Sequence, residues 1–430
     1  MPLCRRSWKA ISSACSRSAT IPLSLRNSTL TSGDSRSTRR APSPTPTEIW
    51  RILLKISDVK CFPCFSASRN YLFVKVETDE DLYGVGEFGI TWKEHAGIGV
   101  IEHLKSDLIG QDPLNTEYLW QLMFRGDFFP GGRVGMAAQS AIDIALWDIK
   151  GKALNQPAYM LLGGKMRERV VCYKGIGGKT PEDTARAAKE RVAEGWKFLR
   201  LGVMDRNGVL DGPTAVRDAV DHFAAVREAV GPDIEIVIDV HTRLDPPDTI
   251  RLGRKLEAYD PFFVEDPLRC ENPQSYRLVR QQVPVPLAIG EHFATKWEFR
   301  QLIEEDLLDY ARIDLCIVGG LTEARKIANW CETHYIKIVP HNPLGPISAA
   351  ACLHLDIATD NFAVQEAGLV GNPVMEDLFP VQVPYKNGYM LAPTTPGLGV
   401  EFNEDAAKKY PFKAIHGPRL HRSDGSFTNW

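Results

Sequence analysis

The sequence lacks several features that would narrow its function at once. No apolar stretch approaches the roughly 18 residues that a membrane-spanning helix needs, so we expect a soluble protein without a membrane partner. An excess of basic charge is missing too: 51 Lys and Arg face 54 Asp and Glu, a formal net charge of −3. Without a broad basic surface, nucleic acid is not indicated as a partner either. The composition, 44% hydrophobic and 24% charged over 430 residues, is that of a globular protein with room for two domains, and a small-molecule function is favoured.

Cysteines do not occur in a pattern that indicates disulfides or zinc. There are nine of them, an odd number spread over a long chain, which is typical of reduced thiols inside a cell. One local C-x-x-C pair, Cys61 and Cys64, has no second pair to complete a zinc site. Because it follows the strand-like stretch Ile56–Lys60 and does not open a helix, we interpret the pair as structural or incidental.

The near-zero net charge hides an unequal distribution. Residues 1–47 hold eight basic side chains and one acid, a net charge of +7, which leaves 43 basic and 53 acidic side chains, or −10, for the other 383 residues. This segment is rich in Ser and ends in the Pro-rich stretch Ala41–Pro46. Its composition predicts a transit peptide and a mitochondrial location. A disordered tail on a cytoplasmic protein and a gene-start error are the alternatives.

Residues 48–165 indicate a domain of strands followed by helices. The strand-like stretches are Ile52–Ile56, Tyr71–Glu77 and Gly84–Glu87, and turn residues between the last two predict an antiparallel meander. Apolar residues then recur at helical spacing in Ile101–Ile109, Thr116–Phe124 and Met136–Ala153. We therefore expect an α+β domain here, and we expect the C-terminal segment 379–430, which returns to strand-like sequence, to pack against it.

Residues 166–378 show a repeated pattern of short apolar strands and helical stretches. Subtracting the positions of the last six strand ends gives steps of 26, 26, 23, 27 and 25 residues, the period of a repeated strand-and-helix unit. Eight such units close as a (β/α)8-type barrel, in which the chemistry lies at the carboxyl ends of the strands. The apolar runs are Val170–Tyr173, Phe198–Leu201, Ile234–Asp239, Phe262–Glu265, Pro286–Glu291, Tyr310–Asp314, Ile336–His341 and Phe362–Glu366.

Three acids end successive strands of this barrel and indicate a metal site. Asp239, Glu265 and Glu291 project towards one point if their strands are neighbours, and carboxylate oxygens in that number suit Mg²⁺. Without a cation, three converging acids would repel one another and have raised pKa values. The alternative is that each acid is separately paired in a structural salt bridge.

Two histidines flank the predicted ion and are candidates for proton transfer. His241 lies two residues beyond Asp239, and His341 ends a strand further round the barrel. Asp314 ends the strand before His341, where it could hold one ring nitrogen and raise the basicity of the other. The alternative is that each is a hydrogen-bonded core histidine.

Six motifs in order resemble the enolase superfamily, and within its mandelate racemase branch they are most similar to the D-galactonate dehydratase group. The resemblance runs from about Ile56 to Trp430. The motifs are Ala137–Lys152, Asp239–Arg243, Phe263–Pro267, Ala288–Glu291, Asp314 followed by Gly319–Glu323, and His341–Ile347.

The resemblance implies an α/β fold, a capping α+β domain over a modified (β/α)7β TIM-type barrel, with one Mg²⁺ on Asp239, Glu265 and Glu291. It also implies a dehydration of an aldonate, D-galactonate first. In the family pattern, the residue matching His341 removes the proton α to the carboxylate with support from Asp314. His241 protonates the departing 3-hydroxyl, and Glu366 hydrogen-bonds the developing enediolate. The product is a 2-keto-3-deoxy acid.

The chain departs from the family pattern at the second barrel strand. Many relatives carry a Lys-x-Lys pair there, but Lys197–Arg200 lacks that spacing, which leaves the proton transfers to the two histidines. The stretches Asp239–Leu244 and Leu302–Asp309 look partly like the mannonate dehydratase group. Another aldonate, such as a gluconate-, mannonate- or arabinonate-like acid, is therefore an alternative substrate, and a catalytically idle sugar-acid-binding protein is an alternative function.

Substrate contacts are the least specific part of the prediction. We expect the capping loops to set specificity, because a few hydrogen bonds separate one epimer from another. Relatives in this family commonly form homo-oligomers, which we expect here as well. The candidate loops are Phe65–Arg69, Phe88–His95 and Gly126–Gly132, and the candidate contact residues are Arg243, His292, Arg200 and Tyr173.

Overall fold

The computed structural model describes residues 54–203, 212–368 and 371–428. The predicted leader, residues 1–47, lies outside the described residues, as do residues 48–53 at the start of the predicted capping domain. Within the described residues, no helix combines the length and the apolar character that crossing a membrane requires.

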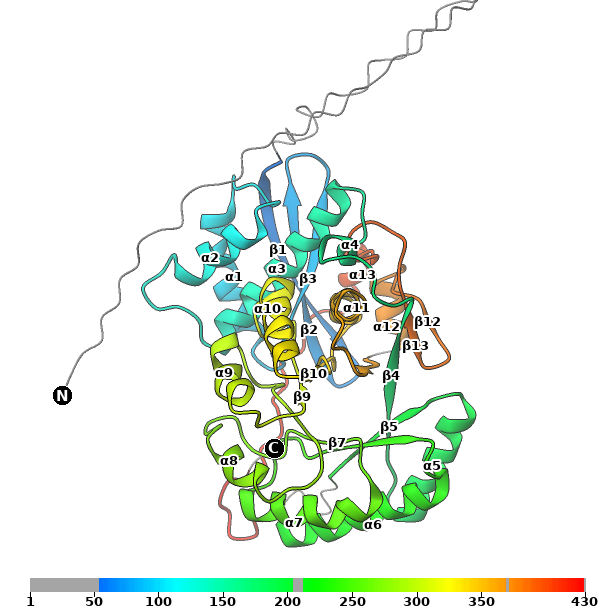
Figure 1. Ribbon diagram of the computed structural model, residues 1–430. Helices are drawn as coiled ribbons and strands as arrows, with labels where there is room; N and C mark the ends of the chain where they lie inside the picture. The colour runs from blue at the N-terminus through cyan, green and yellow to red at the C-terminus, as the bar shows by residue number, and fades with distance from the viewer. Residues whose placement is uncertain (1–53, 204–211, 369–370, 429–430) are drawn as a thin grey trace, which may run out of the picture. The chain divides into compact units, whose positions relative to one another are not determined.

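An antiparallel sheet and four helices form the capping domain, drawn in blue to green in Figure 1. The long helix α3 lies so close to β3 that a Cβ at Gly84 or Gly86 would meet backbone oxygens of Ala145 and Ala141, 2.0 and 1.7 Å away. Glycine is therefore required at both positions for this packing. The elements are β1 (Ile56–Ser66), β2 (Arg69–Thr78), β3 (Tyr83–Phe88), α1 (Glu94–Leu108), α2 (Thr116–Arg125), α3 (Arg133–Ala153) and α4 (Ala158–Leu161).

The first strand differs from the prediction. It begins at Ile56, where the predicted strand Ile52–Ile56 was expected to end, and it contains Cys61 and Cys64. Pro63 lies inside it and faces Leu72 of β2, which is tolerated because β1 is an edge strand of the sheet. Burial raises the pKa of both cysteine thiols to about 12, which disfavours the thiolate form, as expected of a structural pair.

Eight parallel strands close into the predicted barrel. Hydrogen bonding runs in sequence order from β4 to β10, and β11 pairs with β4. A parallel bridge between Ile338 of β10 and Phe362, just before β11, completes the ring. The strands are β4 (Arg169–Ile176), β5 (Phe198–Gly202), β6 (Glu235–Asp239), β7 (Phe263–Glu265), β8 (Leu287–Ile289), β9 (Tyr310–Ala311), β10 (Lys337–Ile338) and β11 (Gln365–Glu366).

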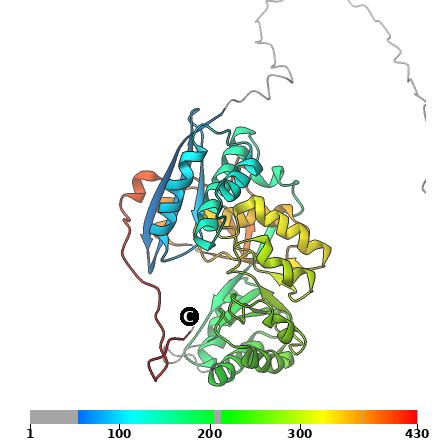
Figure 2. The same ribbon diagram turned by 90° about the vertical axis from the view of Figure 1, so that its left-hand side faces the viewer.

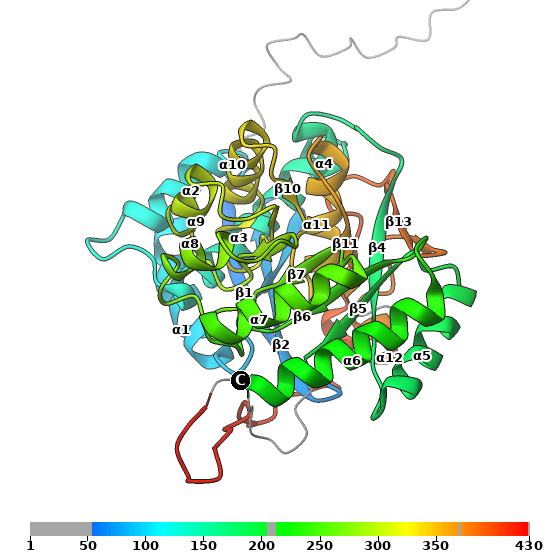
Figure 3. The ribbon, with the colours of Figure 1, turned by 60° about the horizontal axis from the view of Figure 1, so that its bottom comes forward.

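Among the described residues, seven α-helices connect the eight strands, so the predicted (β/α)7β fold is confirmed. Figure 3 shows α5, α6 and α7 side by side in green outside the strands. Helix α5 starts after Thr180, whose side chain accepts a hydrogen bond from the backbone N–H of Asp183. The helices are α5 (Pro181–Ala193), α6 (Gly212–Val230), α7 (Pro246–Leu256), α8 (Ser275–Arg280), α9 (Lys296–Glu304), α10 (Gly320–Thr333) and α11 (Pro346–Ala358).

The C-terminal segment contacts both the barrel and the capping sheet. Its strand β13 (Tyr389–Leu391) pairs with β12 (Tyr385–Lys386) and, antiparallel, with β4. Further along, α13 (Glu404–Ala407) lies beside β1, as Figure 2 shows, and the Phe402 ring packs edge-on against Phe62 at 5.0 Å. A short helix, α12 (Pro373–Leu378), precedes these strands.

Candidate functional site

The three predicted metal ligands lie at the carboxyl ends of neighbouring barrel strands. Asp239 and Glu265 are direct partners in the parallel ladder between β6 and β7, and Glu291 follows β8 by two residues. All three side chains are buried. The regular strand period therefore does bring these acids to one mouth of the barrel, where the chemistry of this type of fold is found.

The tightest group of acids contains one residue that the sequence did not single out. Single oxygens from Glu265, Asp266 and Glu291 lie within 4.8 Å of one another, the arrangement among the described residues that could hold a metal ion. The Asp239 carboxylate is not part of this group; it accepts hydrogen bonds from the Arg200 guanidinium and from the backbone N–H of His241. The ligand set of Asp239, Glu265 and Glu291 stays a prediction.

The chemistry of these acids fits Mg²⁺. Burial raises the pKa of Glu291 well above its usual value, and it raises the pKa of Asp266 to about 7. The oxygens Glu265 Oε2 and Glu291 Oε2 are buried and accept no hydrogen bond, and the basic groups beside them, Arg200 Nε and His341 Nε2, lie 3.5 and 3.4 Å away. Buried carboxylates of this kind are costly unless a cation compensates them, and hard oxygen donors are those that Mg²⁺ prefers.

His341 and Asp314 form a hydrogen-bonded pair beside these acids. His341 Nδ1 lies 2.8 Å from Asp314 Oδ2, and His341 Nε2 lies 3.4 Å from Glu291 Oε2. Asp314 is itself held, because its Oδ1 accepts the backbone N–H of Cys316 at 2.7 Å. The contact with Asp314 leaves Nε2 as the nitrogen directed at the acid cluster, where a substrate would bind.

The two histidines have pKa shifts in opposite directions. Burial alone lowers the pKa of His341, but the charge of Glu291 and the hydrogen bond to Asp314 outweigh it and raise the pKa to about 9. Burial, with the positive charges of Arg243 and Arg200, lowers the pKa of His241 despite the nearby Asp239. In the absence of a metal ion, these surroundings favour the protonated form of His341 and the neutral form of His241.

A fully buried arginine connects the acids, and the sequence analysis did not identify it. Arg312 donates to Glu366 Oε2 at 2.9 Å and lies 2.8 Å from Glu265 Oε1. Despite burial, which alone would raise it, the pKa of Glu366 is strongly lowered by Arg312 and Arg200, so this carboxylate is ionised. The signal was in the sequence, because Arg312 lies two residues before Asp314 in an extended run and so shares its side of the strand.

The predicted substrate-contact residues divide into two groups. Arg200 and Tyr173 line a cavity of about 240 Å³ at the barrel mouth, together with Asn342 and Glu366. The Tyr173 hydroxyl is buried and has no hydrogen-bond partner among the described residues. Arg243 and His292 are not among the residues that line this cavity: Arg243 donates to the Val203 carbonyl at 3.3 Å. His292 Nε2 lies 3.6 Å from Glu291 Oε1, at the edge of the acid cluster.

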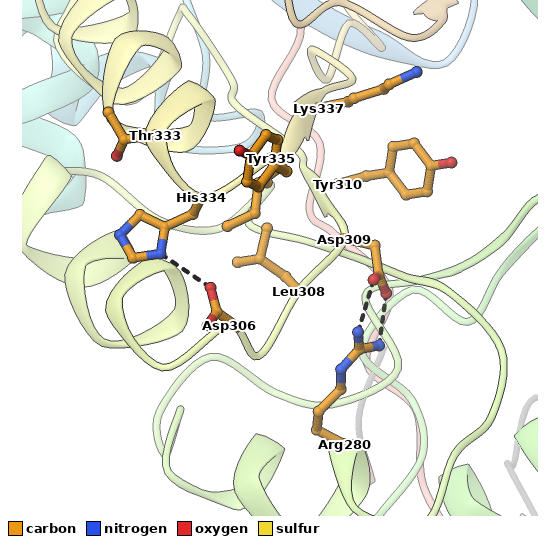
Figure 4. A pocket seen from close by; sticks show the side chains of 10 residues that line it. Arg280, Asp306, Leu308, Asp309, Tyr310, Thr333, His334, Tyr335 and Lys337 are labelled. Atoms are coloured by element: carbon orange, nitrogen blue, oxygen red, sulfur yellow. Dashed lines mark hydrogen bonds and ion pairs between the residues drawn. The ribbon is translucent and has the colours of Figure 1, made fainter.

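A second cavity, of about 540 Å³, lies at the other end of the barrel (Figure 4). It is lined by the segments that lead into β9 and β10, and Figure 4 shows Arg280 paired with Asp309 and His334 paired with Asp306 in it. These segments lie at the amino ends of the strands, away from the acid cluster, and in this type of fold that end contributes to stability. The candidate active site is therefore the barrel mouth, where the acid cluster and the smaller cavity lie.

Comparisons with known proteins identify the family of both domains. Residues 64–163 match the mandelate racemase / muconate lactonizing enzyme N-terminal domain, and residues 183–406 match the enolase C-terminal domain-like family.

Two curated relatives are similar over most of their length. A D-mannonate dehydratase of Caulobacter sp. (strain K31) is 38% identical over 405 residues, which covers 88% of this chain and 100% of the relative. A D-galactonate dehydratase of Ralstonia nicotianae is 37% identical over 369 residues, which covers 84% of this chain and 97% of the relative.

A solved structure supports the same assignment. The crystal structure of an enolase from Pantoea ananatis with bound D-gluconate and Mg superposes with a TM-score of 0.83 at 30% identity, over 87% of this chain and 99% of that one. Together with the family matches, this confirms the resemblance seen in the sequence motifs. The chain belongs to the enolase superfamily, in its mandelate racemase and muconate lactonizing enzyme branch and in the D-galactonate dehydratase group of that branch.

Proposed function

We propose that the protein is a Mg²⁺-dependent acid-sugar dehydratase that removes water from an aldonate, with D-galactonate as its first candidate substrate. The observation that carries this proposal is the His341–Asp314 pair, whose free ring nitrogen lies 3.4 Å from a buried carboxylate of the acid cluster. Relatives named D-galactonate and D-mannonate dehydratase support the reaction class, which is that of a hydro-lyase.

The residues of the site divide the proton transfers between them. His341 Nε2 takes the proton from the carbon next to the carboxylate, and Asp314 holds the ring through Nδ1. When bound, Mg²⁺ supplies positive charge that stabilises the negative charge developing on the substrate carboxylate. The acids Glu265, Asp266 and Glu291, with Asp239, are the residues that would hold the ion.

His241 completes the elimination. As the C3–O bond breaks, His241 donates a proton to the departing hydroxyl, which leaves as water, and the enol that remains tautomerises to a 2-keto-3-deoxy acid. Glu366, held ionised by Arg312, lies in the cavity wall and accepts a hydrogen bond from the substrate. In the absence of a cation, the charge of Glu291 raises the pKa of His341 to about 9 and keeps the ring protonated. A positive charge near Glu291 is therefore needed to bring the pKa of His341 towards neutrality.

D-Mannonate is the second candidate substrate, and the 38% identity to a D-mannonate dehydratase favours it. D-Galactonate and D-mannonate have opposite configurations at C2, so they present the proton to opposite faces of the developing planar centre. A base fixed on one side of the site, as His341 is, therefore discriminates between them.

The test is a screen of aldonates with the purified full chain and Mg²⁺, in which 2-keto-3-deoxy products are identified by mass spectrometry. We expect turnover of D-galactonate. Turnover of D-mannonate alone would replace the first candidate with the second. Binding of aldonates without any turnover would instead favour the idle sugar-acid-binding protein.

A further inference from the structure

The capping domain inserts a buried carboxylate into the start of barrel helix α11. Glu87, at the end of β3, accepts the backbone N–H of Gly345 at 2.7 Å and that of Ser348 at 3.0 Å. Its side chain is fully buried, and no side chain at the N-cap position of α11 performs this task. A helix start needs such acceptors for its unpaired N–H groups, so Glu87 caps α11 from another domain.

A second carboxylate repeats the arrangement at the neighbouring helix. Asp143 of α3 accepts the backbone N–H of Thr322 at 3.0 Å and its hydroxyl at 2.5 Å, in the first turn of α10. Glycines leave room for both acids: a Cβ at Gly345 would lie 2.8 Å from Glu87 Oε1, and a Cβ at Gly320 would lie 2.2 Å from Asp143 Oδ2. Among the described residues, neither Glu87 nor Asp143 forms an ion pair.

The two capped helices directly follow the two members of the proposed catalytic pair. His341 lies four residues before Gly345, and Asp314 lies six residues before Gly320. The capping sheet also contacts the Asp314 loop, because the Gly89 N–H donates to the Cys316 carbonyl at 3.1 Å. The positions of both side chains are thus determined from the capping domain as well as from the barrel.

We propose that Glu87 and Asp143 are positioning residues for the dehydration: by capping α11 and α10 from the capping domain, they fix the loops that place His341 against Asp314. The proposal rests on the proposed function, in which His341 is the base. Buried acids whose partners are helix N–H groups and a hydroxyl, with no ion-pair partner among the described residues, are costly to retain, and a role in geometry accounts for them.

The experiment compares Glu87→Gln and Asp143→Asn with Asp148→Asn in the full chain. Asp148 is the control, since it is also buried on α3 and accepts the backbone N–H groups of Val85 and Leu398 at 3.1 and 2.8 Å, but it contacts neither loop. It differs from the two tested acids in that it also pairs with Lys152 at 2.7 Å. Gln places an amide NH₂ against an N–H donor of α11, so the cap is half lost. Displacement of a catalytic group by about 1 Å costs up to about 100-fold in rate.

We expect Glu87→Gln and Asp143→Asn to lower kcat for the best aldonate by roughly 10- to 100-fold. KM should change less than about threefold, because the acid cluster and the residues that line the cavity at the barrel mouth are unchanged. Hydrogen–deuterium exchange of peptides spanning 341–348 and 314–322 should accelerate in the respective variants. Asp148→Asn should leave kcat and both peptides close to wild type. Equal losses of kcat in all three variants, or unchanged exchange in both peptides, would overturn the proposal.

Gly345→Ala tests the same contact from the barrel side without removing a charge. Its methyl group displaces the Glu87 carboxylate, so kcat should fall and exchange of the 341–348 peptide should rise, as in Glu87→Gln. If Gly345→Ala instead keeps the wild-type kcat and exchange rate, the proposal is refuted, even if Glu87→Gln does not fold. The exchange measurement needs no substrate. A wild-type protein inactive on every aldonate would therefore defeat the proposed function, while the peptides would still decide whether the capping acids hold these loops.

Discussion

Arg312 offers the sharpest test of how the site is held together, through the substitution Arg312→Met. The guanidinium is fully buried and lies against two carboxylates, Glu265 and Glu366, and it donates to the carbonyls of Val339 and Pro340 at 3.1 and 3.2 Å. Methionine keeps much of the apolar stem but removes the charge and every donor. Breaking one side of a buried ion pair costs about 3–5 kcal/mol, because the remaining carboxylates are left uncompensated.

The cost should depend on pH in a defined direction. In the wild type the pKa of Glu366 is lowered, so its ionised form contributes stability above the unfolded value of about 4.3, and this contribution is lost as the pH falls. Burial raises the pKa of Glu265 even with Arg312 present, and this pKa should rise further without the arginine. Both effects make the deficit of Arg312→Met largest at neutral pH and smaller near pH 4.

Urea unfolding in EDTA, followed by tryptophan fluorescence, measures this difference. Arg280→Met is the matched control: Arg280 pairs with Asp309 through two contacts of 2.7 Å, but both side chains are about one-third exposed, so the loss should stay below about 1 kcal/mol. An Arg312→Met deficit equal to that of the control, or one that does not shrink at acidic pH, would refute the view that Arg312 compensates buried carboxylates.

Four further predictions concern catalysis and location. His341→Asn should reduce exchange of the substrate α-proton with solvent deuterium by about 10²- to 10⁴-fold, and persistent exchange would exclude His341 as the base. His241→Asn should retain that exchange but lose a similar factor in dehydration; loss of both together would assign it another role. EDTA should abolish turnover and added Mg²⁺ should restore it, whereas activity that is insensitive to the chelator would contradict the metal site. Residues 1–47 fused to a fluorescent protein should direct it to mitochondria, and a cytosolic signal would refute the predicted transit peptide.

The barrel was predictable because its signal is periodic. Strands buried on both faces read as short apolar runs, and six of them end in an acid or a histidine at steps of 23 to 27 residues. The structure places β6 to β11 at those runs. The first capping strand was harder to place, because an edge strand tolerates residues such as Pro63 that weaken the pattern used to recognise strands.

The site was only partly predictable, for a physical reason. His341 and Asp314 end consecutive strands, so their contact follows from the topology. Asp266 is a single charge next to Glu265, and no spacing distinguishes it. Arg312 alternates with Asp314 along the strand, but its contacts with Glu265 and Glu366 come from other strands and are not visible in that spacing. Glu87 reaches a partner 258 residues away, and such a contact exists only once two domains are packed together.

The account depends most on one claim, that His341 removes the proton next to the carboxylate of an aldonate. The most direct test is to incubate the wild-type chain and His341→Asn with Mg²⁺ and D-galactonate and to measure the 2-keto-3-deoxy acid formed. We predict product with the wild type and a loss of at least about 100-fold in the variant. Product formation at an equal rate by both proteins would contradict the account, as would a wild type that dehydrates no aldonate.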